Sequence, residues 1–225
     1  MKKTFFSLLF SAGIFLLAGL IRQDWPNAVE AGGNGEAQAG EAPVVALTFD
    51  DGPHPVYTEL LLDGLKERGV KATFFLIGVN VEGHEDIVQR IANDGHLIGN
   101  HTYSHIQLTS VPDEKACQEI DEANRVIGEA CGQEIRYIRP PFGSWQEDLE
   151  SLTDMQVVLW SVDPQDWRVQ DTKTVAERVL SDVEDGDIIL LHDVYRSSVE
   201  AALQIVDELT RQGYEFVRVD ELLLD

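Results

Sequence analysis

Two adjacent carboxylates, Asp50 and Asp51, are the residues of this sequence best placed to do chemistry. They follow an apolar run at residues 44–47 and precede Gly52-Pro53, so the pattern predicts a buried strand that ends in two acids. Neighbouring residues of a strand point to opposite sides, so one acid can bind an ion while the other handles a proton. The same pair could also simply close a turn, and the rest of the chain must decide between these interpretations.

A second polar group, His101 and His105, has a spacing of four residues, which is one helical turn. That spacing lets both imidazoles face one ion. Two histidines and one carboxylate leave open positions around a divalent metal, as a catalytic metal site requires. Position 102 is Thr, so the pattern differs from the HExxH motif of zinc proteases. A single histidine is more often structural, but beside an Asp-Asp strand end the metal site is the stronger interpretation.

The elements that must position these residues alternate between strand and helix about seven times. Each expected strand is a nearly continuous apolar run, as in a parallel sheet covered on both faces. The strands are expected at residues 44–47, 72–77, 96–99, 135–138, 157–160, 187–191 and 215–217. The helices are expected at residues 57–68, 85–93, 112–130, 147–153, 172–183 and 199–211. The pattern predicts one α/β domain, either a doubly wound open sheet or a closed β/α barrel.

Polar residues collect directly after these strands. In both folds the carboxyl ends of parallel strands share one face, so we expect the groups to converge there. They occupy residues 50–51, 100–105, 139–143, 163–167 and 192–193. An acid pair, two histidines, an arginine and a further Asp–His combination would then line a single site.

The chain resembles the NodB-type polysaccharide deacetylases, carbohydrate esterase family 4, over about residues 43–225. The segments TFDDGP, HTYSH, RPPFG, DPQDW and LLHD are similar to the five motifs of that family and occur in its order. The resemblance implies a distorted parallel β/α barrel of about seven strands that removes acetyl groups with the help of a metal. Its usual substrates are N-acetyl groups of glucosamine-containing polymers. The alternatives are an acetylxylan-type O-acetyl esterase, a non-catalytic wall-binding module and a non-haem iron oxygenase.

The resemblance assigns an expected role to each matched acid and base. Asp51, His101 and His105 resemble the ligands of the metal, most often zinc, with cobalt or another divalent ion as the alternative. Asp50 resembles the general base that takes a proton from the attacking water. Arg139 resembles the residue that pairs with and orients this base.

Other matched positions concern the leaving group and the substrate. His192 resembles the general acid that protonates the leaving amine, and Asp166 resembles its orienting partner. The backbone N–H of Phe142 matches an oxyanion donor, while Trp167 and Leu190 match the apolar walls that receive the acetyl methyl group. The family often has Tyr where this chain has Phe142, so a hydroxyl contact to the sugar would be absent here.

The remaining polar residues near the motifs are expected to be structural. Asp163 and Asp193 are assigned to loop stabilisation and His96 to the surface or a turn, while Trp145 suits a sugar-facing loop or packing equally. Cys117 and Cys131 would lie near opposite ends of one helix, roughly 20 Å apart and beyond the reach of a disulfide.

The N-terminus has the pattern of an export signal. Lys2 and Lys3 precede an uncharged stretch at residues 5–21. Residues 1–31 are therefore expected to be a cleaved signal peptide or a retained membrane anchor. Residues 32–42 consist of Gly, Ala, Glu, Asn and Gln and suit a flexible linker, which leaves residues 43–225 as the catalytic domain. We expect an extracellular or cell-envelope protein that meets a membrane only through residues 1–31.

The charge of the chain limits its partners. The formal net charge is -23, whereas binding of nucleic acid needs clustered Lys and Arg, so nucleic acid is excluded as a partner. The expected partner is a polysaccharide, peptidoglycan first and chitin oligomers second, and the chain is expected to be a monomer.

Overall fold

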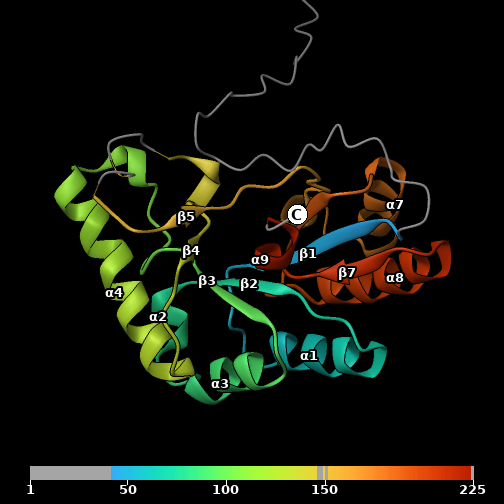
Figure 1. Ribbon diagram of the computed structural model, residues 1–225, viewed down its shortest axis with the longest axis horizontal. Helices are drawn as coiled ribbons and strands as arrows, with labels where there is room; N and C mark the ends of the chain where they lie inside the picture. Colours follow the sequence, from blue (N-terminus) through green and yellow to red (C-terminus); the bar gives the residue numbers. More distant parts are fainter. Residues whose placement is uncertain (1–41, 146–148, 150–151, 224–225) are drawn as a thin grey trace, which may run out of the picture.

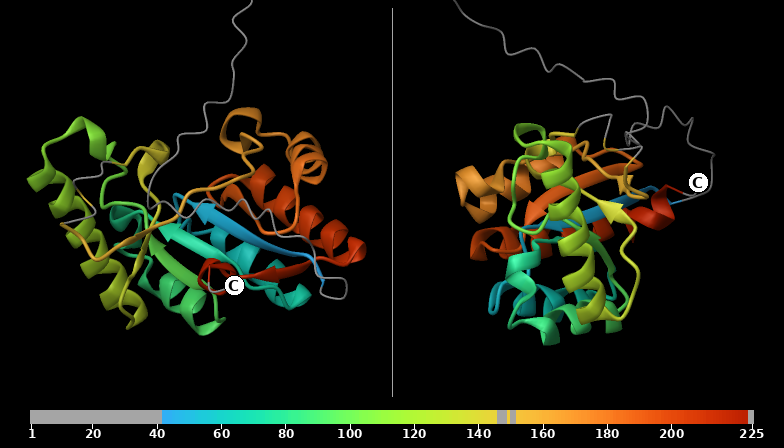
Figure 2. Two further views of the ribbon diagram at one scale, coloured as in Figure 1. Left: turned by 45° about the horizontal axis from the view of Figure 1, so that its top comes forward. Right: turned by 90° about the vertical axis from the view of Figure 1, so that its left-hand side faces the viewer.

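The computed structural model describes residues 42–145, 149 and 152–223. Within these residues, one parallel sheet of seven strands curls into a half-barrel, and the long helices pack around its outside (Figure 1, Figure 2). The strands are β1 (Val44–Asp50), β2 (Thr73–Leu76), β3 (Leu97–Asn100), β4 (Tyr137–Ile138), β5 (Gln156–Val157), β6 (Asp187–His192) and β7 (Glu215–Val217). The predicted distorted parallel barrel is confirmed.

The order of the strands is β5-β4-β3-β2-β1-β6, with β7 paired to the start of β1. The chain after β5 closes this sheet. Val158 N–H donates to the Ile138 carbonyl beside β4, whereas Leu190 N–H on β6 donates to the Val162 carbonyl at 2.9 Å. Because the chain after β5 hydrogen-bonds beside β4 and then to β6, it links the two ends of the strand order, and the sheet forms a distorted barrel instead of an open layer.

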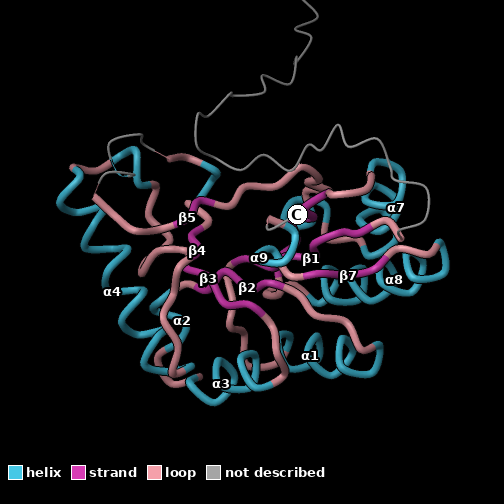
Figure 3. Tube along the Cα trace, viewed as in Figure 1, coloured by secondary structure: helices cyan, strands magenta, loops and turns pink. Residues whose placement is uncertain are grey.

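Figure 3 shows the long helices arranged outside the strands, whereas the short helix at Val219–Leu222 lies against the sheet near its centre. They are α1 (Tyr57–Arg68), α2 (Gly78–Val81), α3 (Glu85–Asn93), α4 (Asp113–Cys131), α6 (Asp166–Val169), α7 (Thr172–Asp182), α8 (Arg196–Gln212) and α9 (Val219–Leu222), with 3-10 turns at Leu108–Ser110 and Pro141–Gly143. α8 packs against α1 and α7, and α4 packs against α2 and α3. The bounds of α1 match the prediction because Gly69 ends the helix with a left-handed φ of 68°.

Several expected elements differ from the structure. β5 is shorter than the strand predicted at residues 157–160, because the chain turns there to cross to β6. The predicted helix at residues 147–153 lies largely outside the described residues. The short C-terminal tail forms α9, whose buried Val219 packs with Ala46 and Phe75 in a small apolar cluster. Cys117 and Cys131 are both free thiols.

Within the part of the chain that the structure describes, no helix has the length and apolar character needed to span a bilayer. The predicted signal or anchor at residues 1–31 lies outside that part. All but the last residue of the predicted linker at residues 32–42 lies outside it as well.

Candidate active site

Asp51, His101 and His105 bring three potential metal ligands to one point. Asp51 Oδ1 lies 3.5 Å from His101 Nε2 and 3.4 Å from His105 Nε2, and the three ligand atoms lie within 4.8 Å of one another. Asp51 Oδ1 is buried and has no hydrogen-bond partner among the described residues. A buried carboxylate oxygen without a partner is costly, and a cation between it and the two imidazoles would satisfy it. One oxygen and two nitrogens suit a divalent metal that keeps open positions.

The two histidines do not meet for the predicted reason. Residues 101–107 form an irregular loop instead of a helical turn, and both Thr102 and His105 have left-handed backbones, with φ of 63° and 57°. The loop geometry, and not a helical period, brings the two Nε2 atoms together.

Asp50 and Asp51 were expected to point to opposite sides of a strand, and the structure differs from this expectation. Asp51 lies beyond the end of β1 with φ of 73°, so the alternation of a strand no longer applies to it. Both carboxylates approach the same imidazole, since Asp50 Oδ2 lies 3.8 Å from His101 Nε2. The two acids therefore border one site from adjacent positions.

Helix α4 holds the histidine loop in place. The Glu119 carboxylate is buried and accepts hydrogen bonds from the N–H and Oγ of Ser104, both at 2.8 Å. Asn100, at the end of β3, accepts from Thr102 N–H at 2.6 Å and donates to the Ile120 carbonyl at 2.9 Å. Sequence reasoning missed Glu119, because a glutamate in a charged helix resembles a surface residue. Its place on the apolar stripe of α4, beside Ile120, was the available signal.

His101 is held in the tautomer that a metal ligand needs. Its Nδ1 lies 2.6 Å from the Arg139 carbonyl, so Nδ1–H donates there and the Nε2 lone pair remains available. Burial lowers the pKa of His101 to about 3, against the opposing charge of Asp51. The ring therefore carries no charge at pH values near 7.

Asp50 and Arg139 form a buried ion pair beside this cluster. Arg139 Nη1 donates to Asp50 Oδ1 at 2.9 Å and to Thr48 Oγ1 at 2.7 Å. Arg139 also donates from Nε to the Val158 carbonyl and from Nη2 to the Leu159 carbonyl. Burial raises the pKa of Asp50, although the Arg139 charge opposes this effect. A carboxylate with a raised pKa accepts a proton more readily, as a general base must.

His192 and Asp166 form a second pair at the end of β6. Asp166, the first residue of α6, accepts from His192 Nδ1–H and from the His192 backbone N–H, both at 2.8 Å. Burial alone would lower the pKa of His192. The hydrogen bond and charge of Asp166, with Asp50 and Asp51, outweigh burial and raise this pKa to about 9. His192 is therefore a protonated ring whose Nε2–H remains available for transfer.

The three residues expected to contact substrate lie in different environments. Phe142 is 65% exposed, and its ring packs edge-to-face on His105 with 5.0 Å between centroids. Trp167 is 49% exposed and follows Asp166 on α6. Leu190 is buried on β6, two residues before His192. Exposed aromatic rings next to a polar site commonly mark a binding surface.

Asp193 braces the loop that carries Asp51. Its carboxylate is fully buried and accepts a hydrogen bond from Thr58 Oγ1. A Cβ at Gly52 would lie 2.6 Å from both Asp193 carboxylate oxygens, so this close approach requires glycine. Burial raises the pKa of Asp193 to about 7. This geometry agrees with the loop-stabilising role expected of Asp193.

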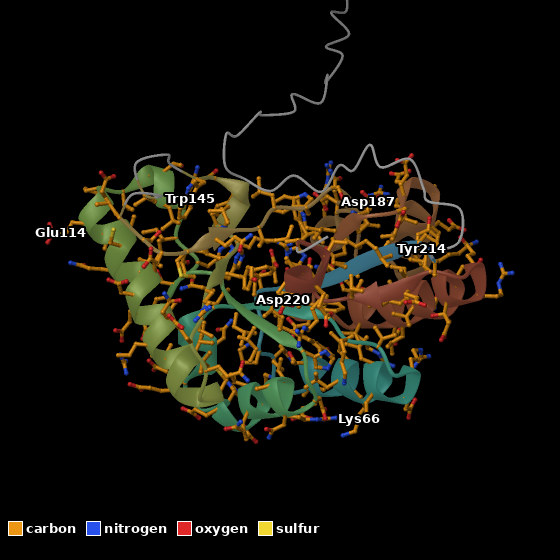
Figure 4. The ribbon with its side chains drawn as sticks, in the orientation of Figure 1. Lys66, Glu114, Trp145, Asp187, Tyr214 and Asp220 are labelled. Atoms are coloured by element: carbon orange, nitrogen blue, oxygen red, sulfur yellow. The ribbon has the colours of Figure 1, made fainter. Side chains whose placement is uncertain are left out.

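Two other expectations concern residues away from the site. His96 was expected at the surface or in a turn. It directly follows the turn at residues 94–95, but the surface position is wrong: the ring is buried, its Nδ1 accepts from Ala72 N–H at 3.0 Å, and burial lowers its pKa to about 4. Trp145, labelled in Figure 4, is buried in a cluster with Leu108 and Ile120, so packing is its role.

A sequence profile described as polysaccharide deacetylase matches residues 37–158 of the chain. Peptidoglycan-N-acetylmuramic acid deacetylase PdaC of Bacillus subtilis is 41% identical over 179 residues, which cover 80% of this chain and 38% of PdaC. The chain belongs to the polysaccharide deacetylase family. The PdaC structure agrees with a TM-score of 0.79 at 40% identity, and the match covers 81% of this chain and 90% of the PdaC chain in that structure.

Two further members of the family have different named substrates. A peptidoglycan-N-acetylglucosamine deacetylase of Bacillus cereus is 40% identical over 185 residues, which cover 79% of this chain and 67% of the relative. A chitooligosaccharide deacetylase of Sinorhizobium fredii is 41% identical over 156 residues, which cover 68% of this chain and 73% of the relative. This chain therefore spans between about two fifths and three quarters of the length of these three relatives.

Proposed function

We propose that the chain is an exported, metal-dependent hydrolase that removes N-acetyl groups from a GlcNAc-containing polysaccharide. The observation that carries the proposal is the unpartnered Asp51 Oδ1 between two imidazole nitrogens, flanked by the Asp50–Arg139 and Asp166–His192 pairs. Hydrolysis of an amide needs an activated water, a proton acceptor and a proton donor, and these groups can supply all three. The named activities of the relatives support the same reaction.

Asp51, His101 and His105 would hold the metal, with zinc the first choice and cobalt or another divalent ion the alternative. A divalent cation there would polarise the acetyl carbonyl and make a water molecule more acidic. The neutral state of His101, which its buried position favours, suits a ligand because a protonated ring has no free lone pair.

Asp50 is the proposed general base. Arg139 occupies its Oδ1 at 2.9 Å, so Oδ2, the oxygen that faces His101 Nε2, is the one that accepts a proton from water. Arg139 is itself fixed by Thr48 and two backbone carbonyls, which keeps the carboxylate in one orientation. The pair therefore prepares the base before substrate arrives.

His192 is the proposed general acid. A sugar amine is a poor leaving group until its nitrogen is protonated, and His192 Nε2–H can supply that proton while Asp166 stabilises the ring position. The Phe142 backbone N–H is proposed to donate to the developing oxyanion. Trp167 and Leu190 are proposed to enclose the acetyl methyl group, one as an exposed wall and the other as a buried one.

Residues 43–225 are proposed to be the catalytic domain. Residues 1–31 would export the chain or anchor it in a membrane, and residues 32–42 would tether the domain. We propose an extracellular or envelope location, a monomeric state and peptidoglycan as the first substrate, with chitin oligomers second.

One assay tests the proposal. The metal-free protein should release no acetate from peptidoglycan, N-acetylglucosamine oligomers or acetylated xylan, and added zinc should restore release from at least one of the first two. Release from xylan alone would show an O-acetyl esterase. Binding to all three polymers with no release would show a non-catalytic module, and a requirement for oxygen would show an oxygenase.

A further inference from the structure

Arg168 differs from every other basic side chain that the structure describes. The remaining Lys and Arg of residues 42–145, 149 and 152–223 each contact an acidic side chain or a backbone carbonyl. Lys66, labelled in Figure 4, pairs with Asp94, for example, and Arg178 donates to the Pro164 carbonyl. Arg168 is exposed and, within these residues, its side chain has neither kind of partner.

The acids nearest to Arg168 in the sequence are engaged elsewhere. Asp171 caps α7 by accepting from Thr174 N–H at 2.8 Å, and that contact lowers its pKa. Asp166 accepts from His192 and from Trp167 N–H. The guanidinium charge is therefore not neutralised by its own helix or by the start of the next one.

Arg168 also lies close to the site. It is the third residue of the four-residue helix α6, and α6 begins with Asp166, the residue bonded to His192. Arg168 follows Asp166 by about 3 Å along the helix axis but about 200° around it, so the buried Asp166 faces His192 while the exposed Arg168 faces the solvent beside the site. Trp167, the exposed ring proposed to contact the acetyl group, lies between them. A polymer that places one sugar at His192 would extend past this helix.

An unpaired cation on this strongly acidic chain can attract an anionic group of a substrate. The formal net charge is -23, so most of the surface repels an anionic polymer. A planar guanidinium binds a carboxylate through two parallel hydrogen bonds. Because Arg168 has no ion pair within the described residues, it does not have to break one in order to bind a carboxylate of the substrate.

We propose that Arg168 is an anion subsite at the edge of the active site, which binds a carboxylate carried by the glycan strand. The inference rests on the proposed function and narrows it: the preferred substrate is a carboxylate-bearing glycan such as peptidoglycan, and a neutral N-acetylglucosamine oligomer gains nothing from this residue. The carboxylate can belong to the sugar itself or to an attached peptide.

The experiment compares acetate release, as kcat/KM, from three substrates of similar length. They are peptidoglycan strands with their peptides, strands whose peptides have been removed to leave the sugar-borne carboxylate, and neutral N-acetylglucosamine oligomers. Arg168→Gln should lower kcat/KM on the carboxylate-bearing substrates about three- to tenfold, mainly through KM, as expected for a partly exposed charged contact. Arg168→Glu should lower it further. Both variants should leave the neutral oligomer unchanged.

Arg136→Gln is the matched control, because Arg136 is an exposed arginine paired with Glu134 just before the start of β4, at the end of the barrel away from the site. It should change none of the three rates. A loss confined to peptide-bearing strands assigns the carboxylate to the peptide. A loss confined to peptide-free strands assigns it to the sugar, whose carboxyl group is free only after the peptide is removed, and a loss on both kinds of strand shows that either carboxylate reaches Arg168. An equal loss on all three substrates, or no loss on either anionic one, overturns the subsite.

A binding measurement separates failure of the subsite from failure of the proposed function. If the unsubstituted protein releases acetate from none of the substrates, the proposed function fails, and equilibrium binding of the same strands then tests Arg168 alone. The subsite requires tighter binding of carboxylate-bearing strands than of neutral ones, a preference that Arg168→Gln removes and that weakens between about 50 and 200 mM salt because charges are screened. Equal binding of both kinds by the unsubstituted protein contradicts it.

Discussion

The Asp166→Asn substitution offers the sharpest test of the acid in this site. Asparagine keeps the size of Asp166 and an oxygen that can accept from His192 N–H, but it removes the negative charge. Burial, the largest single influence on His192, remains and lowers the pKa. We therefore expect the pKa of His192 to fall from about 9 in the metal-free protein to 6.5 or below.

The size of the effect follows from these values. At pH 7 a group with a pKa of about 9 is protonated in about 99% of molecules, whereas one with a pKa of 6.5 is protonated in about a quarter. The difference between these two pKa values corresponds to a free energy of about 3 kcal/mol, at about 1.4 kcal/mol per pKa unit. Because the folded state raises this pKa, its contribution to stability is complete below pH 6.5 and disappears as the pH rises through about 9. Asp166→Asn should remove that contribution.

Two measurements check this reasoning. Nuclear magnetic resonance titration of the histidine side chains reports the pKa directly, and the ratio of amide to activated-ester cleavage reports the role of the proton. Asp166→Asn should slow amide cleavage far more than cleavage of an activated acetate ester, whose leaving group needs no proton. Asp163→Asn is the control, since Asp163 accepts from Gln165 N–H and not from His192. A His192 pKa that stays near 9 in Asp166→Asn would refute the account of this pair.

Three further substitutions test other parts of the structure. His105→Ala should weaken zinc binding, measured by competition with a chelator, at least about tenfold, because it removes one of three ligands; unchanged affinity would exclude His105 as a ligand. Arg139→Ala should lower the free energy of unfolding in urea by about 3–5 kcal/mol, because it leaves buried Asp50 without its partner; a loss below 1 kcal/mol would contradict this. Gly52→Ala should lower the melting temperature and zinc affinity together, because the new Cβ meets the Asp193 carboxylate; a wild-type melting curve would show that the loop can yield.

The sequence predicted the order of the strands and the longer helices, and the face on which the motif segments meet, but not the short helices α2, α6 and α9. Apolar strand runs, and glycines after helices such as Gly69, are local signals, so α1, α3 and β7 have the predicted bounds. The convergence of the motif segments follows from the parallel direction of the strands. Those features depend on hydrophobic periodicity and topology, which a single sequence contains.

The remaining features depend on contacts between distant residues. The left-handed backbones of Asp51 and His105 occur at residues that are not glycine, so the sequence suggested a strand alternation and a helical turn that do not occur. The support of the histidine loop by Glu119 links residues far apart in the chain. Burial of His96 and the role of α9 in filling the barrel also arise only from tertiary packing.

The central claim is that Asp51 and its two histidines hold a metal while Asp50 removes a proton from water. The most direct measurement combines zinc stoichiometry with acetate release for Asp50→Asn, assayed on the substrate that the unsubstituted protein cleaves. The account predicts one zinc per chain, as in the unsubstituted protein, with acetate release reduced by about a hundredfold or more. Retained acetate release with zinc bound would contradict the role of Asp50, and full activity in metal-free protein would contradict the site as a whole.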